Sequence, residues 1–245
     1  MLKIQNLSKH FGGVNAVNNC SFDIKENYIT ALIGPNGSGK STVFNIISQV
    51  VDEDSGRIIF DGKDITNLSP EQVSNEGISR LFQKSQLFDN LTIKENLLLA
   101  IDNEDTKFWK NLLGKNKITK EKQESVNEML KLVEMEFFSN KLGRELSFGQ
   151  KRLIEITRTI LNPHKLLMLD EPIAGVTHKL RTKISDILLN LKKQGATILL
   201  IEHDMNFALN LADEVIVLDE GKVIAKGTPN QIKNNNKVLE AYLGE

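Results

Sequence analysis

The fold of this chain is decided by one stretch near its N-terminus, Gly34-Pro35-Asn36-Gly37-Ser38-Gly39-Lys40-Ser41. This stretch matches the phosphate-loop pattern G-x-x-x-x-G-K-[ST] without a gap. The apolar run Tyr28 to Ile33 comes directly before it and predicts a strand, and Thr42 to Val50 comes after it and predicts a helix. A strand, a glycine-rich loop and a helix in this order are typical of a unit that binds the phosphates of a nucleotide.

Each residue type in the loop has a physical use around a phosphate. Glycines let backbone N–H groups turn inward, Lys40 supplies a positive charge, and Ser41 can bind Mg²⁺. The helix that begins near Lys40 directs the positive end of its dipole at the anion. The alternative to a phosphate-binding loop is a glycine-rich turn before an ordinary helix. The expected phosphate-binding residues are Gly34, Pro35, Asn36, Gly37, Ser38, Gly39, Lys40, Ser41 and Thr42.

Two carboxylates end an apolar run that predicts a buried strand, Leu166 to Leu169. Because open α/β sheets bind ligands at the carboxyl ends of their strands, Asp170 is placed to hold Mg²⁺ and Glu171 to orient or deprotonate the attacking water. His203 follows a second such run, Thr197 to Ile201, and should reach the same edge. We assign it a γ-phosphate contact or the orientation of the base, against the alternative of a structural histidine.

Composition limits the class of protein. The chain has 245 residues and 31 Lys plus Arg against 32 Asp plus Glu, so its net charge of -1 gives no general attraction to nucleic acid or anionic membranes. Cys20 is the only cysteine, and we expect it to be a small buried hydrophobe in a reducing compartment. No apolar run approaches the roughly 20 residues of a spanning helix, and Met1 to Phe11 lacks the apolar region of a secretory signal. Membrane association would therefore come through a partner.

The order of patterns predicts an α/β chain with two additions. Alternating apolar residues in the first 24 residues, and Arg57 to Phe60 before the turn pair Asp61-Gly62, predict an antiparallel β-layer. Residues 91–146 look helical, with an apolar stripe at Val126, Met129, Leu130 and Val133 after Thr119 as N-cap.

Between these helical parts, residues 102–117 are polar and predict a short insertion or surface helix. A helix follows from Leu180 to Leu191, and Gly195 is expected to end it. A final hairpin is predicted from Val215 to Ala225 around Glu220-Gly221.

A family resemblance starts from Leu146-Ser147-Phe148-Gly149-Gln150, which is followed by Lys151-Arg152. The run resembles the signature of ABC ATPases, usually LSGGQ, in which Ser147 and the Gly149 N–H at a helix N-terminus form a second phosphate-binding surface. The resemblance covers nearly the whole chain. Phe11 stands where the family stacks an aromatic residue on adenine, Gln83 matches the Q-loop glutamine, and Asp170, Glu171 and His203 match the Walker B pair and the switch histidine.

The resemblance implies an α/β P-loop NTPase of the ABC ATPase kind. It would have a RecA-like core with an N-terminal antiparallel β subdomain, at residues 1–90 and 156–245, and an inserted helical subdomain at residues 91–155 that carries the signature. The implied cofactors are ATP and Mg²⁺. The implied catalytic residues are Glu171, His203 and Gln83, the metal ligands Ser41, Gln83 and Asp170, and the further ATP-binding residues Phe11, Ser147, Phe148, Gly149 and Gln150.

The resemblance also implies partners. Two such domains would pack head to tail, with each ATP between Lys40 of one chain and Ser147 of the other. Since the chain has one phosphate loop and one signature, a complete pair of sites needs a second chain, identical or related. An isolated monomer should be nearly inactive.

Within the family, the chain resembles the ATP-binding subunits of branched-chain amino acid importers. The shared habits are the aromatic residue in the signature (Phe148), Ala174-Gly175 after the Walker B pair, the segment Ile201 to Met205, and the ending Ala241-Tyr242-Leu243-Gly244. This resemblance predicts transmembrane permease subunits as direct partners, a substrate-binding protein as an indirect partner, and no nucleic acid partner. It also predicts that the chain lies peripherally on the cytoplasmic face of the inner or plasma membrane and is soluble when isolated. The alternatives are cassettes for urea import or lipopolysaccharide export, and a non-transport ABC protein.

The chain departs from the family pattern at two points. Phe148 replaces a glycine, so it must adopt an ordinary φ unless the loop is strained. Val176-Thr177-His178 replaces the usual ending of the D-loop, commonly Leu-Asp, which links the two ATP sites. The coupling between those sites is the property that this second departure would change.

Overall fold

The structure is a computed structural model that describes residues 1–82, 87–101 and 120–243. The chain divides into two compact units. Unit 1 comprises Met1–Arg80, Lys165–Glu171 and Leu189–Glu245, and unit 2 comprises Leu81–His164 and Pro172–Leu188. Within the described ranges, none of the helices is both long enough and apolar enough to cross a membrane.

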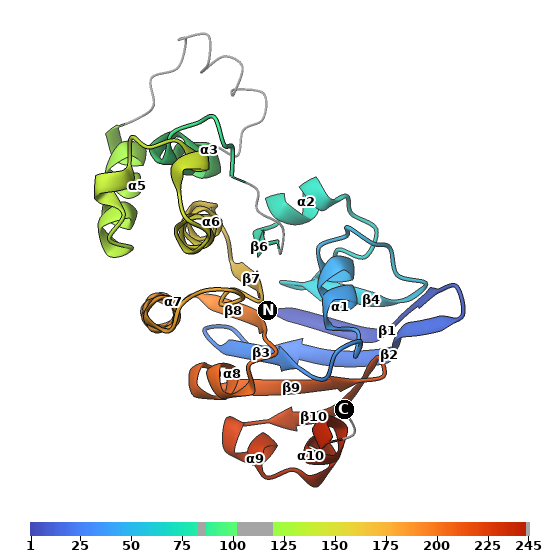
Figure 1. Ribbon diagram of the computed structural model, residues 1–245. Helices are drawn as coiled ribbons and strands as arrows, with labels where there is room; N and C mark the ends of the chain where they lie inside the picture. Colours follow the sequence, from blue (N-terminus) through green and yellow to red (C-terminus); the bar gives the residue numbers. More distant parts are fainter. Residues whose placement is uncertain (83–86, 102–119, 244–245) are drawn as a thin grey trace. The chain divides into compact units, whose positions relative to one another are not determined.

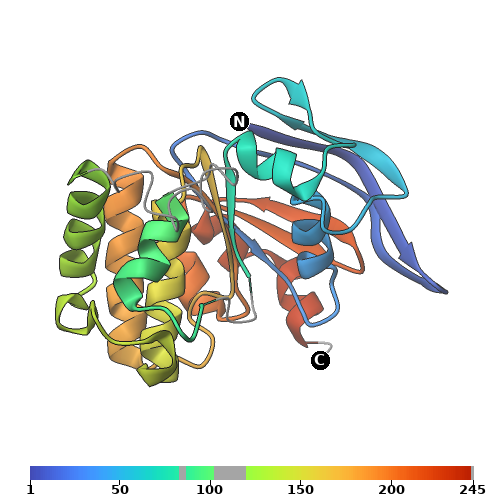
Figure 2. The ribbon, with the colours of Figure 1, turned by 90° about the horizontal axis from the view of Figure 1, so that it is seen from above.

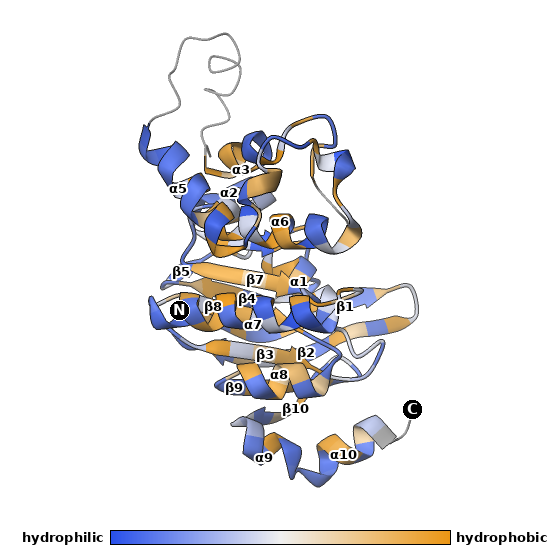
Figure 3. Cartoon of the chain, turned by 60° about the vertical axis from the view of Figure 1, so that its left-hand side comes forward, coloured by the Kyte–Doolittle hydropathy of each residue, from blue (hydrophilic) through white to orange (hydrophobic). Residues whose placement is uncertain are grey.

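In the described part of unit 1, the larger sheet has six strands in the order β10-β9-β3-β8-β7-β6, the last of which ends one residue into unit 2. Strand β3 pairs in parallel with β8 and β9, β7 pairs in parallel with β8, and β10 closes one edge in antiparallel fashion. Every residue of β3, β7 and β8 is buried, which explains their largely apolar sequences, and β7 stands out as apolar in Figure 3. The strand bounds are β3 Ile29–Ile33, β6 Ile78–Leu81, β7 Leu166–Asp170, β8 Thr197–Ile201, β9 Glu214–Asp219 and β10 Lys222–Gly227.

The smaller sheet of unit 1 is antiparallel, with the described strands in the order β2-β1-β4-β5. They span Leu2–Phe11 (β1), Val14–Ile24 (β2), Ser55–Phe60 (β4) and Lys63–Asp64 (β5), and β1 and β2 run side by side as the long blue ribbons of Figure 2. Asp61 and Gly62 both have positive φ, 49° and 81°, as a tight two-residue hairpin requires. The predicted N-terminal β-layer and its turn are confirmed.

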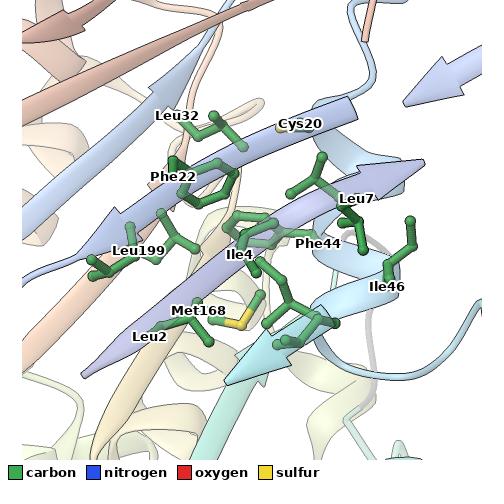
Figure 4. Packing of buried hydrophobic residues seen from close by; sticks show 14 of the residues in the cluster. Leu2, Ile4, Leu7, Cys20, Phe22, Leu32, Phe44, Ile46, Met168 and Leu199 are labelled. Carbon is green, nitrogen blue, oxygen red and sulfur yellow. The ribbon is translucent and has the colours of Figure 1, made fainter. Parts of the chain in front are cut away.

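Two apolar clusters hold unit 1 together. The larger joins the antiparallel sheet, helix α1 (Lys40–Ile47) and one face of the six-stranded sheet, and Figure 4 shows Phe22 and Phe44 among its members. Cys20 lies in this cluster, and burial raises the pKa of its thiol to about 12, so it is the buried hydrophobe that we expected. The smaller cluster covers the other face of the sheet and contains residues from three helices, α8 (Met205–Leu211), α9 (Pro229–Lys233) and α10 (Asn236–Leu243), which lie near β9 and β10 in Figure 1.

Unit 2 is helical in its described part. Helix α3 (Ile93–Ile101) packs against α5 (Lys120–Leu132) and α6 (Phe148–Leu161), and α7 (His178–Lys193) has its first eleven residues in this unit. Two short 3₁₀ turns, Glu136–Phe138 and Gly143–Glu145, lie between α5 and α6.

The predicted apolar stripe of α5 is present. Val126, Leu130 and Val133 are buried, and Met129 is half-buried. The expected N-cap Thr119 and the insertion at 102–117 lie outside the described residues. The subdomain boundaries at 90/91 and 155/156 stay a prediction.

Most element boundaries agree with the sequence analysis within two or three residues. Gly195 ends α7 with φ 94°, and Ala196 N–H donates to the Leu191 carbonyl 3.0 Å away, the bond of a glycine-terminated helix. Helices α2 (Pro70–Asn75) and α9 were not predicted from the sequence, although each starts with a capping signal. Ser69 and Gln72 form a capping box at α2, and Thr228 and Gln231 form another at α9.

Candidate active site

The phosphate loop, residues 34–41, leaves the carboxyl end of β3 and closes around the side chain of Lys40. Lys40 is 8% exposed, and its ammonium donates to the carbonyl oxygens of Gly34 at 2.8 Å and Pro35 at 2.7 Å, and to Ser38 Oγ at 3.2 Å. A positive charge is thereby held inside the loop by neutral oxygens. An anion that enters the loop therefore meets a lysine that is already in place.

Two glycines are needed because backbone from distant strands touches the loop. A Cβ on Gly34 would lie 2.0 Å from the Leu218 carbonyl oxygen of β9, and one on Gly39 would lie 2.2 Å from the Ala16 carbonyl oxygen of β2. Gly221, in the turn between β9 and β10, donates its N–H to the Ser38 carbonyl oxygen at 3.0 Å. The loop is therefore fixed from outside by strands β2 and β9 and by the turn between β9 and β10.

Helix α1 begins in a way that suits an anion. Its N-cap is Gly39, with φ 100°, and among the described residues no side chain caps the helix. Ser41 is exposed and Thr42 is half-exposed in the first turn, and Asn36 is exposed within the loop. The positive end of the helix thus faces the loop with a hydroxyl group, that of Ser41, accessible beside it.

The carboxyl ends of β7 and β8 bring the expected catalytic residues together. Asp170 is the last residue of β7 and is 2% exposed. Glu171 follows it with φ 47°, a left-handed conformation that costs a non-glycine residue on the order of 1–3 kcal/mol. Its N–H donates to the Ile201 carbonyl oxygen at 3.0 Å, and its Oε2 lies 3.8 Å from Nδ1 of His203, which is more than half exposed. The sharp turn at Glu171 is what directs its carboxylate toward His203.

Arg80, which was not among the expected site residues, contacts Asp170. The Arg80 Nη2 atom lies 3.3 Å from Asp170 Oδ2, and both side chains are almost fully buried, at 6% and 3% exposure. Burial lowers the pKa of Arg80, and the neighbouring Asp170 opposes that shift. An arginine between the apolar residues Ile78 and Leu81 of the short strand β6 was the signal available in the sequence.

The signature lies in unit 2 at the start of α6. Ser147 is the N-cap, and its Oγ accepts from Gln150 N–H at 3.4 Å while Gln150 Oε1 accepts from Ser147 N–H at 2.9 Å. Phe148 is the first helical residue and is not among the described residues with positive φ, so it has the ordinary φ that we expected. Gly149 is the next helical residue, and a Cβ there would meet Leu180 of α7 at 3.2 Å.

The two departures from the family pattern are neighbours in unit 2. The Phe148 ring is 65% exposed, and its Cε1 atom would lie 2.8 Å from a Cβ built on Gly175, which has φ 69°. Gly175 directly precedes Val176-Thr177-His178. The aromatic residue of the signature therefore packs against the loop in which the second departure occurs.

Two other residues, Phe11 and Gln83, were expected at the site. Phe11 ends β1 and is 49% exposed, so it is not a core residue, and the Lys9 ammonium lies 5.6 Å from its ring centroid. Gln83 lies outside the described residues. The roles of all these residues stay predictions.

The donor set fits Mg²⁺ that arrives with a nucleotide. Within the described ranges there is no group of three or more His, Cys, Asp and Glu side chains that could hold a metal ion. Mg²⁺ in nucleotide sites is commonly held by one or two protein oxygens together with phosphate oxygens and water. The Ser41 hydroxyl and the Asp170 carboxylate offer oxygen atoms of this kind.

Comparisons with known proteins agree with this geometry. A family model described as "ABC transporter" matches residues 17–174, and one described as "Branched-chain amino acid ATP-binding cassette transporter" matches residues 222–245. A probable branched-chain amino acid transport ATP-binding protein, LivG, of Archaeoglobus fulgidus is 38% identical, with 100% of this chain and 95% of the relative covered. The high-affinity LivG protein of Escherichia coli K12 is 34% identical, with 100% and 98% covered.

Solved structures agree as well. A nucleotide-free ATP-binding cassette from an ABC transporter has a TM-score of 0.85 at 37% identity, and a cassette in its ADP conformation has 0.86 at 36%, each covering 100% of this chain and 99% of the other. A dimeric bacterial ABC transporter cassette has a TM-score of 0.79 at 27% identity and covers 94% and 99%. The predicted fold class, a P-loop core with an antiparallel β subdomain and an inserted helical part, is confirmed. The chain belongs to the ABC transporter family, as one of its ATP-binding cassettes that hydrolyse ATP.

Proposed function

We propose that this chain is the ATP-hydrolysing subunit of an importer for branched-chain or similar amino acids. The observation that carries the proposal is the phosphate loop that closes around Lys40, at the same sheet edge as Asp170, Glu171 and His203. The names of the curated relatives and the match at residues 222–245 favour branched-chain amino acids over urea or lipopolysaccharide as cargo. Full-length similarity to transport subunits also favours transport over a non-transport ABC function.

In this proposal, ATP binds with Mg²⁺. Its phosphates lie in the loop of residues 34–42, its adenine stacks on Phe11, and Mg²⁺ is held by Ser41 and Asp170, with Gln83 as a further ligand. Glu171 orients or deprotonates the attacking water, because it follows the carboxyl end of β7, at the edge of the sheet where the phosphates would lie. His203, within 4 Å of Glu171, contacts the γ-phosphate or holds the base in place.

The second half of each site would come from a second cassette, identical or related. That chain offers Ser147, Phe148, Gly149 and Gln150 at the N-terminus of α6, where backbone N–H groups and the helix dipole favour a phosphate. Groups supplied in trans in other phosphoryl-transfer reactions contribute roughly 10³ to 10⁵ in rate. Closure of the pair on ATP would thus be required for turnover.

The remaining assignments concern assembly. Permease subunits would span the membrane, a substrate-binding protein would deliver the amino acid to them, and the cassette would sit on the cytoplasmic face. The helical subdomain, residues 91–155, would carry the signature between core segments 1–90 and 156–245. No nucleic acid takes part.

Co-purification and uptake test this function. The chain, tagged and expressed in its native host, should bring down membrane-spanning subunits, and the isolated complex in vesicles should take up labelled leucine only with ATP inside. Lys40→Ala should abolish nucleotide binding and uptake together, because it removes the charge that the loop holds. Recovery of the chain with ribosomes or DNA, or uptake of urea in place of leucine, would contradict the proposal.

A further inference from the structure

Arg80 joins two elements that the proposed metal site depends on. Its guanidinium donates to Ser48 Oγ at 2.6 Å, to Asn45 Oδ1 at 2.8 Å and to the Phe44 carbonyl oxygen at 3.2 Å, all on helix α1 or its C-cap. The same guanidinium donates to Asp170 Oδ2 at 3.3 Å, at the end of β7. All of these residues lie in unit 1.

The two connected elements carry the expected Mg²⁺ ligands. Ser41 is in the first turn of α1, and Asn45 follows it by four residues, which places it one helical turn further along. Asp170 is the other ligand. The distance between the Ser41 hydroxyl and the Asp170 carboxylate is therefore set in part by how Arg80 holds α1 and β7.

The chemistry of arginine suits this task. Its planar group presents five N–H donors in a fixed fork, so it can bind a carboxylate and several helix oxygens at once, which a lysine cannot do with one ammonium. Because the Arg80 and Asp170 side chains are almost fully buried, water cannot replace the guanidinium. Rotation of the Asp170 carboxylate away from its present orientation would break a buried charge-assisted hydrogen bond.

We propose that Arg80 is a positioning residue for the divalent cation: it fixes the Asp170 carboxylate and the helix of Ser41 in the arrangement that Mg²⁺ requires. This inference rests on the proposed function, in which Asp170 and Ser41 hold the metal. Residues that orient metal ligands typically change metal affinity by about 10–100-fold when they are replaced. Arg80 acts through Asp170 and need not touch the nucleotide.

The test compares nucleotide binding with and without metal. A fluorescent ATP analogue is titrated against wild type, Arg80→Lys, Ser48→Ala and Asp170→Asn, first in EDTA and then over a range of Mg²⁺ concentrations. The matched control is Arg57→Lys, an exposed arginine on β4. Thermal melts of each variant establish that it is folded.

Arg80→Lys keeps the charge but loses the fork. We expect its affinity in EDTA to stay within about twofold of wild type, and the Mg²⁺ concentration for half-maximal enhancement to rise about tenfold or more. Ser48→Ala, which leaves Arg80 and Asp170 intact, should shift that concentration in the same direction by less, and serves if Arg80→Lys does not fold. Arg57→Lys should match wild type.

Two results would overturn the inference. If Arg80→Lys weakens binding equally in EDTA and in Mg²⁺, Arg80 is a structural brace only. If Arg80→Lys has the same Mg²⁺ dependence as wild type, Arg80 does not position Asp170. The same conclusion follows from Ser48→Ala if Arg80→Lys does not fold. Asp170→Asn distinguishes failure of the proposed metal site from failure of the role of Arg80. If Asp170→Asn leaves the Mg²⁺ dependence unchanged, the proposed metal role of Asp170 fails, and this inference fails with it.

Discussion

Four glycines that differ in one property at a time allow a graded test of the phosphate loop. Gly13 does not have a φ in the left-handed range, and no atom lies within 4 Å of a Cβ built on it. Gly37 has φ 76°, but its surroundings are equally open. Gly34 (φ 151°) and Gly39 (φ 100°) each have a backbone carbonyl oxygen close to the built Cβ, at 2.0 Å and 2.2 Å respectively. Replacement by alanine therefore adds no strain at Gly13, backbone strain alone at Gly37, and backbone strain together with a steric clash at Gly34 and Gly39.

The expected losses follow from these differences. Gly13→Ala should leave the free energy of unfolding nearly unchanged. Gly37→Ala should lose about 1–2 kcal/mol, the cost of a left-handed conformation for an L-residue. Gly39→Ala and Gly34→Ala should lose a further 1–3 kcal/mol or so, typical of overpacking, because the carbonyl oxygens of Ala16 and Leu218 belong to strands and cannot turn aside as a side chain could.

Urea unfolding of the four variants, followed by circular dichroism, measures this order. Nucleotide titration should show the same order if the loop binds the phosphates as proposed, since that loop is the one that is distorted. Gly39→Ala with the stability of Gly13→Ala would refute the reasoning, because it would mean that β2 does not touch the loop. A loss as large for Gly37→Ala as for Gly39→Ala would refute the clash as the cause.

Three further predictions address other parts of the molecule. Glu171→Gln should keep ATP binding, lower turnover by roughly 10²–10⁴ as the base is lost, and elute as a dimer with ATP on gel filtration; a monomer in ATP would count against the trans-acting site. Burial raises the pKa of Cys20 to about 12, so this thiol should not react with iodoacetamide at pH 8 in the native protein and should react fully in urea; rapid labelling of the native protein would show that the thiol is accessible. The contribution of Cys20 to stability should fall as pH rises past about 8.5, the pKa of the thiol in the unfolded chain. Gly175→Ala should lower the free energy of unfolding by about 1–2 kcal/mol, because Gly175 has a positive φ. Adding Phe148→Ala should not restore this stability, because the exposed Phe148 ring can already move away from the new Cβ. Full restoration of stability in the double variant would show that the contact with the ring dominates.

The sequence predicted those features that depend on local pattern. The phosphate loop, the buried parallel strands after Tyr28, Leu166 and Thr197, and the turn at Asp61-Gly62 each follow from residues adjacent in the chain, because glycine conformations and apolar runs are local properties. The capping boxes at Ser69 and Thr228 were equally local and were available as signals.

Long-range contacts were not readable from the sequence. No pattern indicates that the Leu218 and Ala16 carbonyl oxygens fix the loop; Leu218, for example, is 184 residues away from Gly34, the glycine that it contacts. Arg80 and Asp170 are 90 residues apart, and their pairing depends on β6 lying beside β7. The left-handed φ of Glu171 was also not predictable, because glutamate has no preference for that conformation and only the surrounding strands impose it.

The dependence of ATPase rate on protein concentration tests the central claim most directly, namely that each ATP is hydrolysed between two cassettes. With saturating ATP and Mg²⁺, the rate per chain should rise with concentration and approach zero at dilutions where light scattering shows only monomer. A constant rate per chain across that range, with full activity in strictly monomeric solution, would contradict it.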